Sequence, residues 1–247
     1  MFGFPGAAQH IHRPRESLYP QTILSTPDLF GYWRLNEAAG ANAIDSFGTH
    51  NLSINGTVTI GQEGPILHGG AFLFGGGYLQ SGYTFSSLTE ITIECWLWTS
   101  IADGQRHAIY SDRSNTGIIF MLGPNVVSNG ALYNLTIEQD YPSGAYGRGS
   151  SGQDLNDSAW HHVAGVINGT NGSHNVSDFL LYRDGAEVST YGDETYNGTN
   201  WPLTQDTNFR IGAQTGGGYP FSGYLAELAL YTRALSSDEI AGHFAAR

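Results

Sequence analysis

The sequence predicts an all-β fold, either a sandwich or a barrel of antiparallel strands. Short apolar runs with strand-like alternation follow one another from residue 28 onward, and turn residues separate them at even intervals. Glycine is abundant, at 34 residues, while charged residues make up only 13% of the chain. Strands and helices do not alternate along the sequence, which argues against a parallel sheet. Many short strands joined by glycine-rich turns are typical of sandwiches and barrels.

Residues 1–27 differ in composition from the rest of the chain. They contain four of the nine prolines and show neither a strand nor a helix period. Because proline fixes φ and removes a hydrogen-bond donor, we expect an extended arm here, ordered only by lying on its own sandwich or on a neighbouring subunit. The arm residues expected to make this assembly contact are Phe2, Phe4, Ile11, Arg13 and Arg15. Residues 28–247 are expected to form one sandwich, because their number suits a single large domain.

The expected strands combine β-branched, aromatic and leucine residues with polar ones in alternation. In chain order they are residues 29–35, 52–60 with an Asn-Gly interruption, 71–75, 77–80, 91–99, 106–111, 117–122, 131–137, 160–167, 178–183, 186–190, 208–212 and 224–231. The three runs between residues 106 and 137 are predicted to form a meander. Residues 139–158 are polar and glycine-rich, so we expect a long loop there.

Two local sequence signals predict a turn and a helix in the C-terminal part of the chain. Asp184-Gly185 lies between two expected strands and predicts a tight hairpin. Ser236 and Glu239 have the spacing of a capping box, and Ile240 and Phe244 would share one face of the helix that follows. We therefore expect one short C-terminal helix.

Six groups of segments, taken in chain order, carry a family resemblance. They are Tyr-Trp-Arg-Leu-Asn-Glu-Ala-Ala-Gly at 32–40, Asp-Ser-Phe-Gly at 45–48, Gly-Ala-Phe-Leu-Phe-Gly-Gly-Gly-Tyr-Leu at 70–79, Ile-Thr-Ile-Glu-Cys-Trp-Leu at 91–97, the hairpin beginning Trp-His-His-Val at 160, and Gly-Tyr-Leu-Ala-Glu-Leu at 223–228. Together they resemble laminin G-like, concanavalin A-like lectin domains over residues 28–244. The resemblance implies a jelly roll of two antiparallel sheets, which commonly binds glycans or proteins through loops at one rim.

The same resemblance implies a calcium site. It would be formed by Asp45, Glu227 and backbone carbonyls near His50. Ala226 stands where relatives often have a second acidic residue. The alternative is that Asp45 caps a turn and that Glu227 is solvated on a strand.

Aromatic residues in the expected loops are the best candidates for ligand contact, since flat rings stack against the apolar faces of sugars. With polar neighbours that could orient hydroxyl groups, the ligand-binding candidates are Tyr141, Tyr146, Tyr196, Asn200, Trp201, Tyr219 and Phe221. The alternative is that several of them lie buried under their loops or at a subunit interface.

Other chemistry-bearing residues point to structure rather than catalysis. His161 and His162 are adjacent on a strand, so they face opposite sides; we expect one to pack beside Trp160 and the other to face solvent. Glu90 and Glu94 are four residues apart, without a third acid at the spacing that a glycosidase strand of this fold would carry. Cys95, the single cysteine, lies in an apolar run and is expected to be buried and inert.

We therefore expect a protein without enzymatic activity. The net charge of −12 disfavours binding to nucleic acid, and no apolar run is long enough to span a membrane. The favoured function is a virion component, such as a capsid decoration or tail-fibre protein. Its arm would contact neighbouring subunits of a homo-oligomer or a larger assembly, and its sandwich would bind glycans or proteins. The first residues lack the pattern of a signal peptide, which suits release by lysis to a virion or extracellular surface. The alternatives are a secreted carbohydrate-binding module and, less favoured, a glycoside hydrolase.

Overall fold

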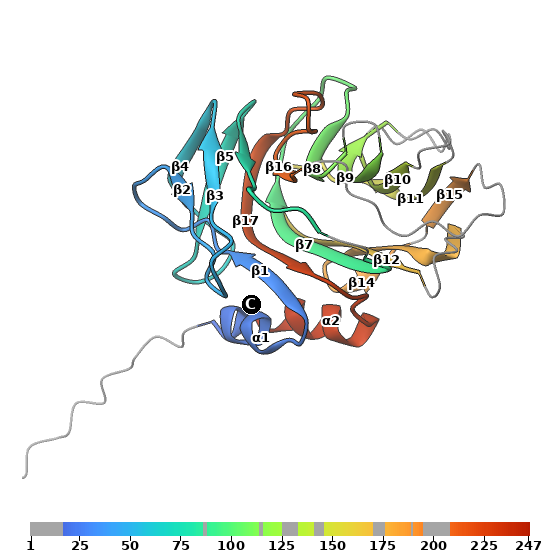
Figure 1. The fold of residues 1–247 in the computed structure, drawn as a ribbon, viewed down its shortest axis with the longest axis horizontal. Helices are drawn as coiled ribbons and strands as arrows, with labels where there is room; N and C mark the ends of the chain where they lie inside the picture. Colours follow the sequence, from blue (N-terminus) through green and yellow to red (C-terminus); the bar gives the residue numbers. More distant parts are fainter. Residues whose placement is uncertain are drawn as a thin grey trace, which may run out of the picture.

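The protein is a sandwich of two antiparallel sheets with two short helices on one outer face (Figure 1). The computed structural model describes residues 17–85, 88–113, 116–124, 133–140, 146–169, 176–188, 190–194 and 208–247. Within these residues, sheet A has eight strands and sheet B has nine. The predicted all-β sandwich is confirmed.

Sheet A has the strand order β14-β13-β12-β7-β17-β5-β4, and β1 pairs with β17 beside this path. Its strands are β1 (Leu29–Trp33), β4 (Val58–Glu63), β5 (Gly70–Gly75), β7 (Glu90–Trp98), β12 (Trp160–Asn168), β13 (Phe179–Arg183), β14 (Ala186–Glu187) and β17 (Ser222–Tyr231).

Sheet B has the order β15-β11-β10-β9-β8-β16-β6-β3-β2. Its strands are β2 (Asn42–Ala43), β3 (Leu52–Asn55), β6 (Tyr78–Gln80), β8 (His107–Ser111), β9 (Gly117–Gly123), β10 (Asn134–Asp140), β11 (Tyr146–Asp154), β15 (Thr190–Glu194) and β16 (Arg210–Ile211). The meander predicted between residues 106 and 137 is the run β8-β9-β10.

The main core lies between the two sheets, because alternate residues of each strand point inward. On β7 the inward residues are Ile91, Ile93, Cys95 and Leu97, and all four are fully buried. Cys95 is the buried thiol that the sequence predicts, and burial raises its pKa.

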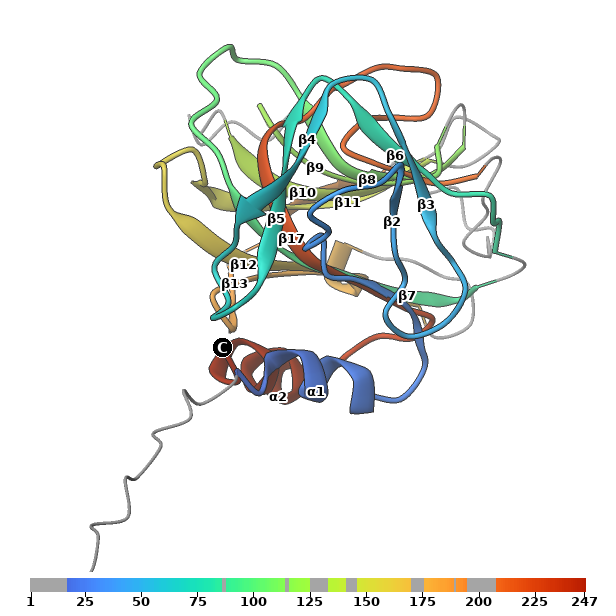
Figure 2. The same cartoon turned by 90° about the vertical axis from the view of Figure 1, so that its left-hand side faces the viewer.

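A second apolar layer lies on the outer face of sheet A. The helices α1 (Tyr19–Ser25) and α2 (Ser237–Ala245) lie side by side across this face (Figure 2). Tyr19 and Ile23, four residues apart on α1, are fully buried against it, and Ile240 of α2 is buried in the same cluster. The outer face of sheet A therefore has its own packed cover.

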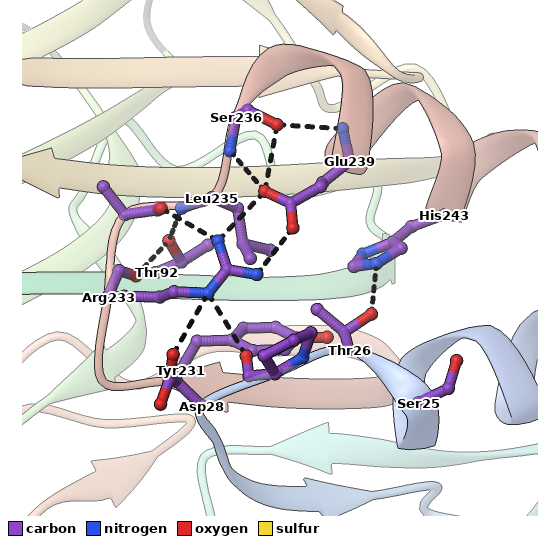
Figure 3. A network of polar contacts seen from close by, with 12 residues as sticks. Ser25, Thr26, Asp28, Thr92, Tyr231, Arg233, Leu235, Ser236, Glu239 and His243 are labelled. Atoms are coloured by element: carbon purple, nitrogen blue, oxygen red, sulfur yellow. Dashed lines mark hydrogen bonds and ion pairs between the residues drawn. The ribbon is translucent and has the colours of Figure 1, made fainter.

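Helix α2 begins at the predicted capping box. The Ser236 side chain accepts the backbone N–H of Glu239, and the Glu239 carboxylate accepts the N–H of Ser236 at 2.9 Å. Arg233 donates to both oxygens of Glu239, at 2.6 and 3.0 Å (Figure 3). The Arg233 guanidinium is the main reason why the pKa of Glu239 falls to about 2. Thr92 donates to the Arg233 carbonyl at 2.8 Å and so ties this turn to β7.

A buried carboxylate on β7 connects α2 to sheet A. Glu94 has no exposed surface, and its Oε1 lies 2.9 Å from His243 Nδ1 on α2 and accepts the Tyr231 hydroxyl of β17 at 2.9 Å. Its Oε2 lies 3.3 Å from His162 Nε2 on β12. Burial opposes ionisation of Glu94, but the two histidines outweigh this effect and lower its pKa to about 2. One charged group thus links two neighbouring strands and a helix to β7.

The prediction of an extended arm over residues 1–27 is wrong for its last part. Tyr19–Ser25 form a helix instead of continuing an extended arm. Pro20 is compatible with this helix because it lies in the first turn, where its missing N–H needs no partner. Seven residues are too few for a stable isolated helix, so packing of the Tyr19 and Ile23 side chains must stabilise it. The sequence period could not reveal a helix of two turns.

Two further expectations about strands need correction. Residues 139–158 are not one long loop, because β10 extends to Asp140 and Tyr146–Asp154 form β11. The glycines of β11 have a packing reason, because Gly147 and Gly149 lie against Phe179, where a side chain would collide with the ring or the backbone. The run at residues 52–60 is divided at its Asn-Gly step, and its two halves enter different sheets.

The Glu94 contacts generate a stability prediction. Glu94→Ala removes one partner from a buried ionic cluster and should lower the free energy of unfolding by about 3 kcal/mol near pH 7. Urea denaturation measures this, with the exposed Glu187→Ala as a matched control that should change little. Because the folded pKa of about 2 lies below the usual 4.5, this contribution is complete above pH 4.5. This contribution should disappear as the pH falls toward 2. If Glu94→Ala lowers the free energy of unfolding equally at all pH values, the stabilisation does not come from ionised Glu94.

Candidate functional site

A half-buried row of aromatic side chains crosses the outer face of sheet A. Trp160 of β12 is the direct cross-strand partner of Trp98 on β7, and Trp98 is in turn the partner of Tyr224 on β17. The row continues to Leu73 on β5. Paired residues of neighbouring strands point to the same side of a sheet, so these four side chains form one line.

The helical cover ends one row before these aromatic residues. Phe244 of α2 stacks on Trp96 with the ring centroids 5.8 Å apart, and the Arg247 guanidinium lies 5.9 Å from the same ring. Trp96 is only 3% exposed, whereas Trp98, two residues later on the same face, is half-buried. The row thus borders the apolar layer and is open to solvent.

The rings of the row stand at large angles to one another. The Trp98 and Tyr224 centroids are 5.4 Å apart with an interplanar angle of 81°. Trp160 and Tyr224 are 6.1 Å apart at 54°. The edge-to-face contact of Trp98 with Tyr224 is a favourable geometry for an aromatic pair. The result is a set of contacting rings that remain partly accessible to solvent.

A pocket of about 390 Å³ lies on this row. Its lining consists of Trp98, Trp160 and Tyr224 together with Gln62 and Glu63 from β4. Glu63 is exposed, so its carboxylate can accept hydrogen bonds from a ligand, and the Gln62 amide is partly held by the Ile60 carbonyl at 3.2 Å. A few polar groups beside aromatic walls are typical of small-molecule sites.

The aromatic row was not among the residues that the sequence analysis singled out for binding. The available signal was the period of two on β7, which places Trp96 and Trp98 on the face opposite Leu97. Their different exposure depends on where α2 ends, and strand alternation does not carry that information.

The predicted loop candidates have different outcomes. The prediction that Phe221 contacts a ligand is wrong, because its side chain is fully buried. Its ring centroid lies 6.1 Å from that of Phe74. Tyr219 is half-buried in the loop before β17, where the Arg106 guanidinium lies 5.7 Å from its ring. Tyr146 begins β11, but its side chain lies outside the described residues. Also outside them are Tyr141, Tyr196, Asn200 and Trp201, and the arm residues Phe2, Phe4, Ile11, Arg13 and Arg15.

Asp45 holds a loop together. Its Oδ1 accepts the backbone N–H groups of Tyr32 at 3.0 Å and Phe47 at 2.9 Å, and its Oδ2 accepts that of His50 at 3.1 Å. The His50 carbonyl accepts the indole N–H of Trp33 at 2.8 Å. These contacts match the turn-capping alternative for Asp45.

Glu227 lies in a bulge of β17, where the register shifts between Ala226 and Ala229. Its φ of 51° is the left-handed conformation, which a non-glycine residue rarely adopts. The side chain is fully buried and accepts hydrogen bonds from the Tyr32 hydroxyl and an Arg34 N–H, so the alternative of a solvated Glu227 is wrong. Burial raises its pKa despite these two partners.

The calcium site stays a prediction. In the part of the chain that the structure describes, no three His, Cys, Asp or Glu side chains are grouped so that they could hold a metal ion. In the same part of the chain, neither helix is long and apolar enough to cross a lipid bilayer.

The two adjacent histidines face opposite sides, but neither faces solvent as expected. His162 is fully buried beside Glu94. His161 is 7% exposed and lies between Asp184 at 2.8 Å and Asp157 at 3.1 Å. The hydrogen bond to Asp184 raises the pKa of His161. Both histidines therefore lie against neighbouring carboxylates.

Sheet B carries a separate cluster of paired charges on β10. Glu138 contacts Arg113 and lies 3.3 Å from Arg148, and Asp140 lies 2.9 Å from Arg113. Burial raises the pKa of Asp140. Glu138 and its two arginines are at most 7% exposed, so this cluster balances its own charge.

Comparisons with known proteins agree with the sandwich architecture. A family model described as the concanavalin A-like lectin/glucanases superfamily matches residues 73–241. No curated protein matches the sequence.

Three solved structures illustrate the similarity of fold. The binding domain of Paraclostridial Mosquitocidal Protein 1 has a TM-score of 0.62 and 14% identity, over 88% of this chain and 52% of that chain. Domain 4 of AbnA, a GH43 extracellular arabinanase from Geobacillus stearothermophilus in complex with arabinotriose, has a TM-score of 0.62 and 17% identity, over 87% and 98%. The ligand-binding domain of botulinum neurotoxin serotype D, in complex with N-acetylneuraminic acid, has a TM-score of 0.60 and 14% identity, over 92% and 52%.

The chain therefore spans about half the length of the two toxin domains and nearly all of the arabinanase domain. At these identities the similarity concerns the fold.

The Asp45 geometry generates a prediction that also examines calcium. Asp45→Ala leaves three backbone N–H groups without their acceptor and should lower the free energy of unfolding by about 1–3 kcal/mol. Thermal unfolding in EDTA and in excess calcium measures the effect. A loss of the same size in both conditions is expected from a turn-capping aspartate, whereas a loss confined to calcium would show that Asp45 acts through a bound ion.

Proposed function

Since the chain belongs to the concanavalin A-like lectin/glucanases superfamily, we propose that it is a carbohydrate-binding module whose ligand rests on the aromatic row of sheet A. The row, rather than the predicted rim loops, forms the proposed site. The single observation that carries this proposal is the line Trp160-Trp98-Tyr224, which lies on the outer face of sheet A beside the part that the helices cover.

The chemistry of this row suits a sugar. A pyranose or furanose ring has an apolar C–H face that packs on an aromatic ring, and hydroxyl groups at its edge that need polar partners. Trp98, Trp160 and Tyr224 supply the rings, while Glu63 and Gln62 supply an acceptor and an amide at the border of the same pocket. Strands rather than loops carry the three rings, so the free protein already holds the site in its binding geometry, which lowers the entropic cost of binding.

The solved structures of similar fold support a role in binding. One is a binding domain, another is a ligand-binding domain in complex with N-acetylneuraminic acid, and the third is domain 4 of an arabinanase in complex with arabinotriose. This chain matches nearly the full length of the arabinanase domain, so the comparison extends over one whole unit.

We further propose that the protein breaks no bonds. The three buried glutamates of the described chain are engaged by neighbouring side chains: Glu94 by histidines, Glu138 by arginines and Glu227 by Arg34. A glycosidase needs two carboxyl groups held across a scissile bond. At the aromatic pocket, Glu63 is the lining residue with a carboxylate. A binding role needs no second acid there.

The proposal predicts the loss of carbohydrate binding from Trp98→Ala. Removing this ring should weaken binding by about 10- to 100-fold, because an aromatic side chain contributes about 1.5–3 kcal/mol when a ligand buries it. A glycan array first identifies a ligand, with and without calcium, and isothermal titration calorimetry then measures the affinity.

Phe47→Ala is the matched control, since Phe47 is 51% exposed and lies in a loop outside the aromatic row. Its affinity should equal that of the wild type. If the wild-type protein binds no glycan on the array, or if Trp98→Ala and Phe47→Ala bind alike, the row is not a carbohydrate site.

A further inference from the structure

The aromatic row separates two pockets. The first is the pocket beside Gln62, Glu63 and Trp160. The second has a volume of about 300 Å³ and lies on the other side. Trp98 and Tyr224 line both, so these two residues form a shared wall, here called the Trp98–Tyr224 ridge.

The second pocket repeats the combination of apolar and polar groups found in the first. Leu73 and Ile101 supply its apolar surface, and Ser100 and Ser222 are exposed residues that carry hydroxyl groups. It too has walls suited to one sugar ring, with groups that can donate to and accept from sugar hydroxyls. A ligand confined to one pocket would leave the other side of the ridge unused.

The charge that lines the two pockets is negative. Among the described residues that line either pocket, Glu63 is the charged one, and none is arginine or histidine. His68 lines a further hollow that also includes Glu63, and Arg34 lines the next one, together with Leu67 and His68. An anionic sugar on the ridge would therefore meet a carboxylate without a cation in the same pocket to compensate, and its desolvation would be costly.

We infer that the site takes an uncharged chain of at least two sugar units, with one unit on each side of the Trp98–Tyr224 ridge. This inference rests on the proposed carbohydrate-binding function and specifies its ligand class. A chain that crosses the ridge uses both faces of the shared wall, whereas a single sugar uses one.

Chain length provides the first test. Calorimetric titration with L-arabinose, arabinotriose, glucose and cellotriose compares one unit with three for two neutral sugars. In the series that binds, we expect the trisaccharide to bind at least about tenfold more tightly than its monosaccharide. Ser100→Trp, which fills the second pocket, should reduce this ratio toward one. Ser46→Trp places the same bulk on an exposed loop elsewhere and should keep the ratio, and thermal unfolding checks that both variants fold.

Charge provides the second test. The wild type should bind a neutral trisaccharide at least about tenfold more tightly than trigalacturonic acid, which has the same number of units. Glu63→Gln should shift this preference toward the acid, because it removes the carboxylate and keeps the shape of the side chain.

The outcomes separate this inference from the proposed function. If glycans bind and Trp98→Ala abolishes binding, but monosaccharides bind as tightly as trisaccharides or acidic sugars as tightly as neutral ones, the two-pocket inference is overturned and the binding function stands. If Ser100→Trp leaves the trisaccharide ratio unchanged, the second pocket is not used. If the wild type binds no carbohydrate, the function and this inference fail together.

Discussion

The contact of Glu94 with two histidines is the constraint on which the outer layer of the molecule depends. A carboxylate in the middle of β7, with no exposed surface, is tolerable only when cationic or hydrogen-bonding partners surround it. His162 comes from the next strand and His243 from α2, so satisfying this one charge fixes the position of the C-terminal helix over sheet A. Helix α1 then packs beside α2, and the hydroxyl of Thr26 lies 2.9 Å from Nε2 of His243.

The position of α2 also determines which part of the sheet stays open. Phe244 lies on Trp96, and the cover ends there. The next row of the sheet, with Trp98 and Tyr224, consequently meets solvent although its residues are as apolar as those under the helices. A row of apolar side chains that remains open to solvent on a protein surface is a feature of binding surfaces. In this protein the same ionic contact therefore stabilises the fold and sets the border of the proposed site.

Much of the fold could be predicted from strand alternation and turn chemistry, and the candidate site could not. The hairpin at Asp184-Gly185 and the capping box at Ser236 are local signals, and both are confirmed. Helix α1 was missed because its stability comes from burial of Tyr19 rather than from its own sequence. The exposure of Trp98 depends on a contact between residues almost 150 positions apart, Glu94 and His243, and the burial of Phe221 depends on sheet packing. Local sequence patterns do not report such distant pairings.

The thiol of Cys95 has a practical consequence. It is the sole cysteine of the chain, and the core encloses it completely. Maleimides and similar electrophiles attack thiolates that water can reach, so the native protein should resist them. A cysteine introduced at an exposed position, such as Ala102 near the end of β7, would then be the one reactive site in the folded molecule. A fluorophore attached there would report ligand occupancy from a single, known location, without any need to remove a native residue first.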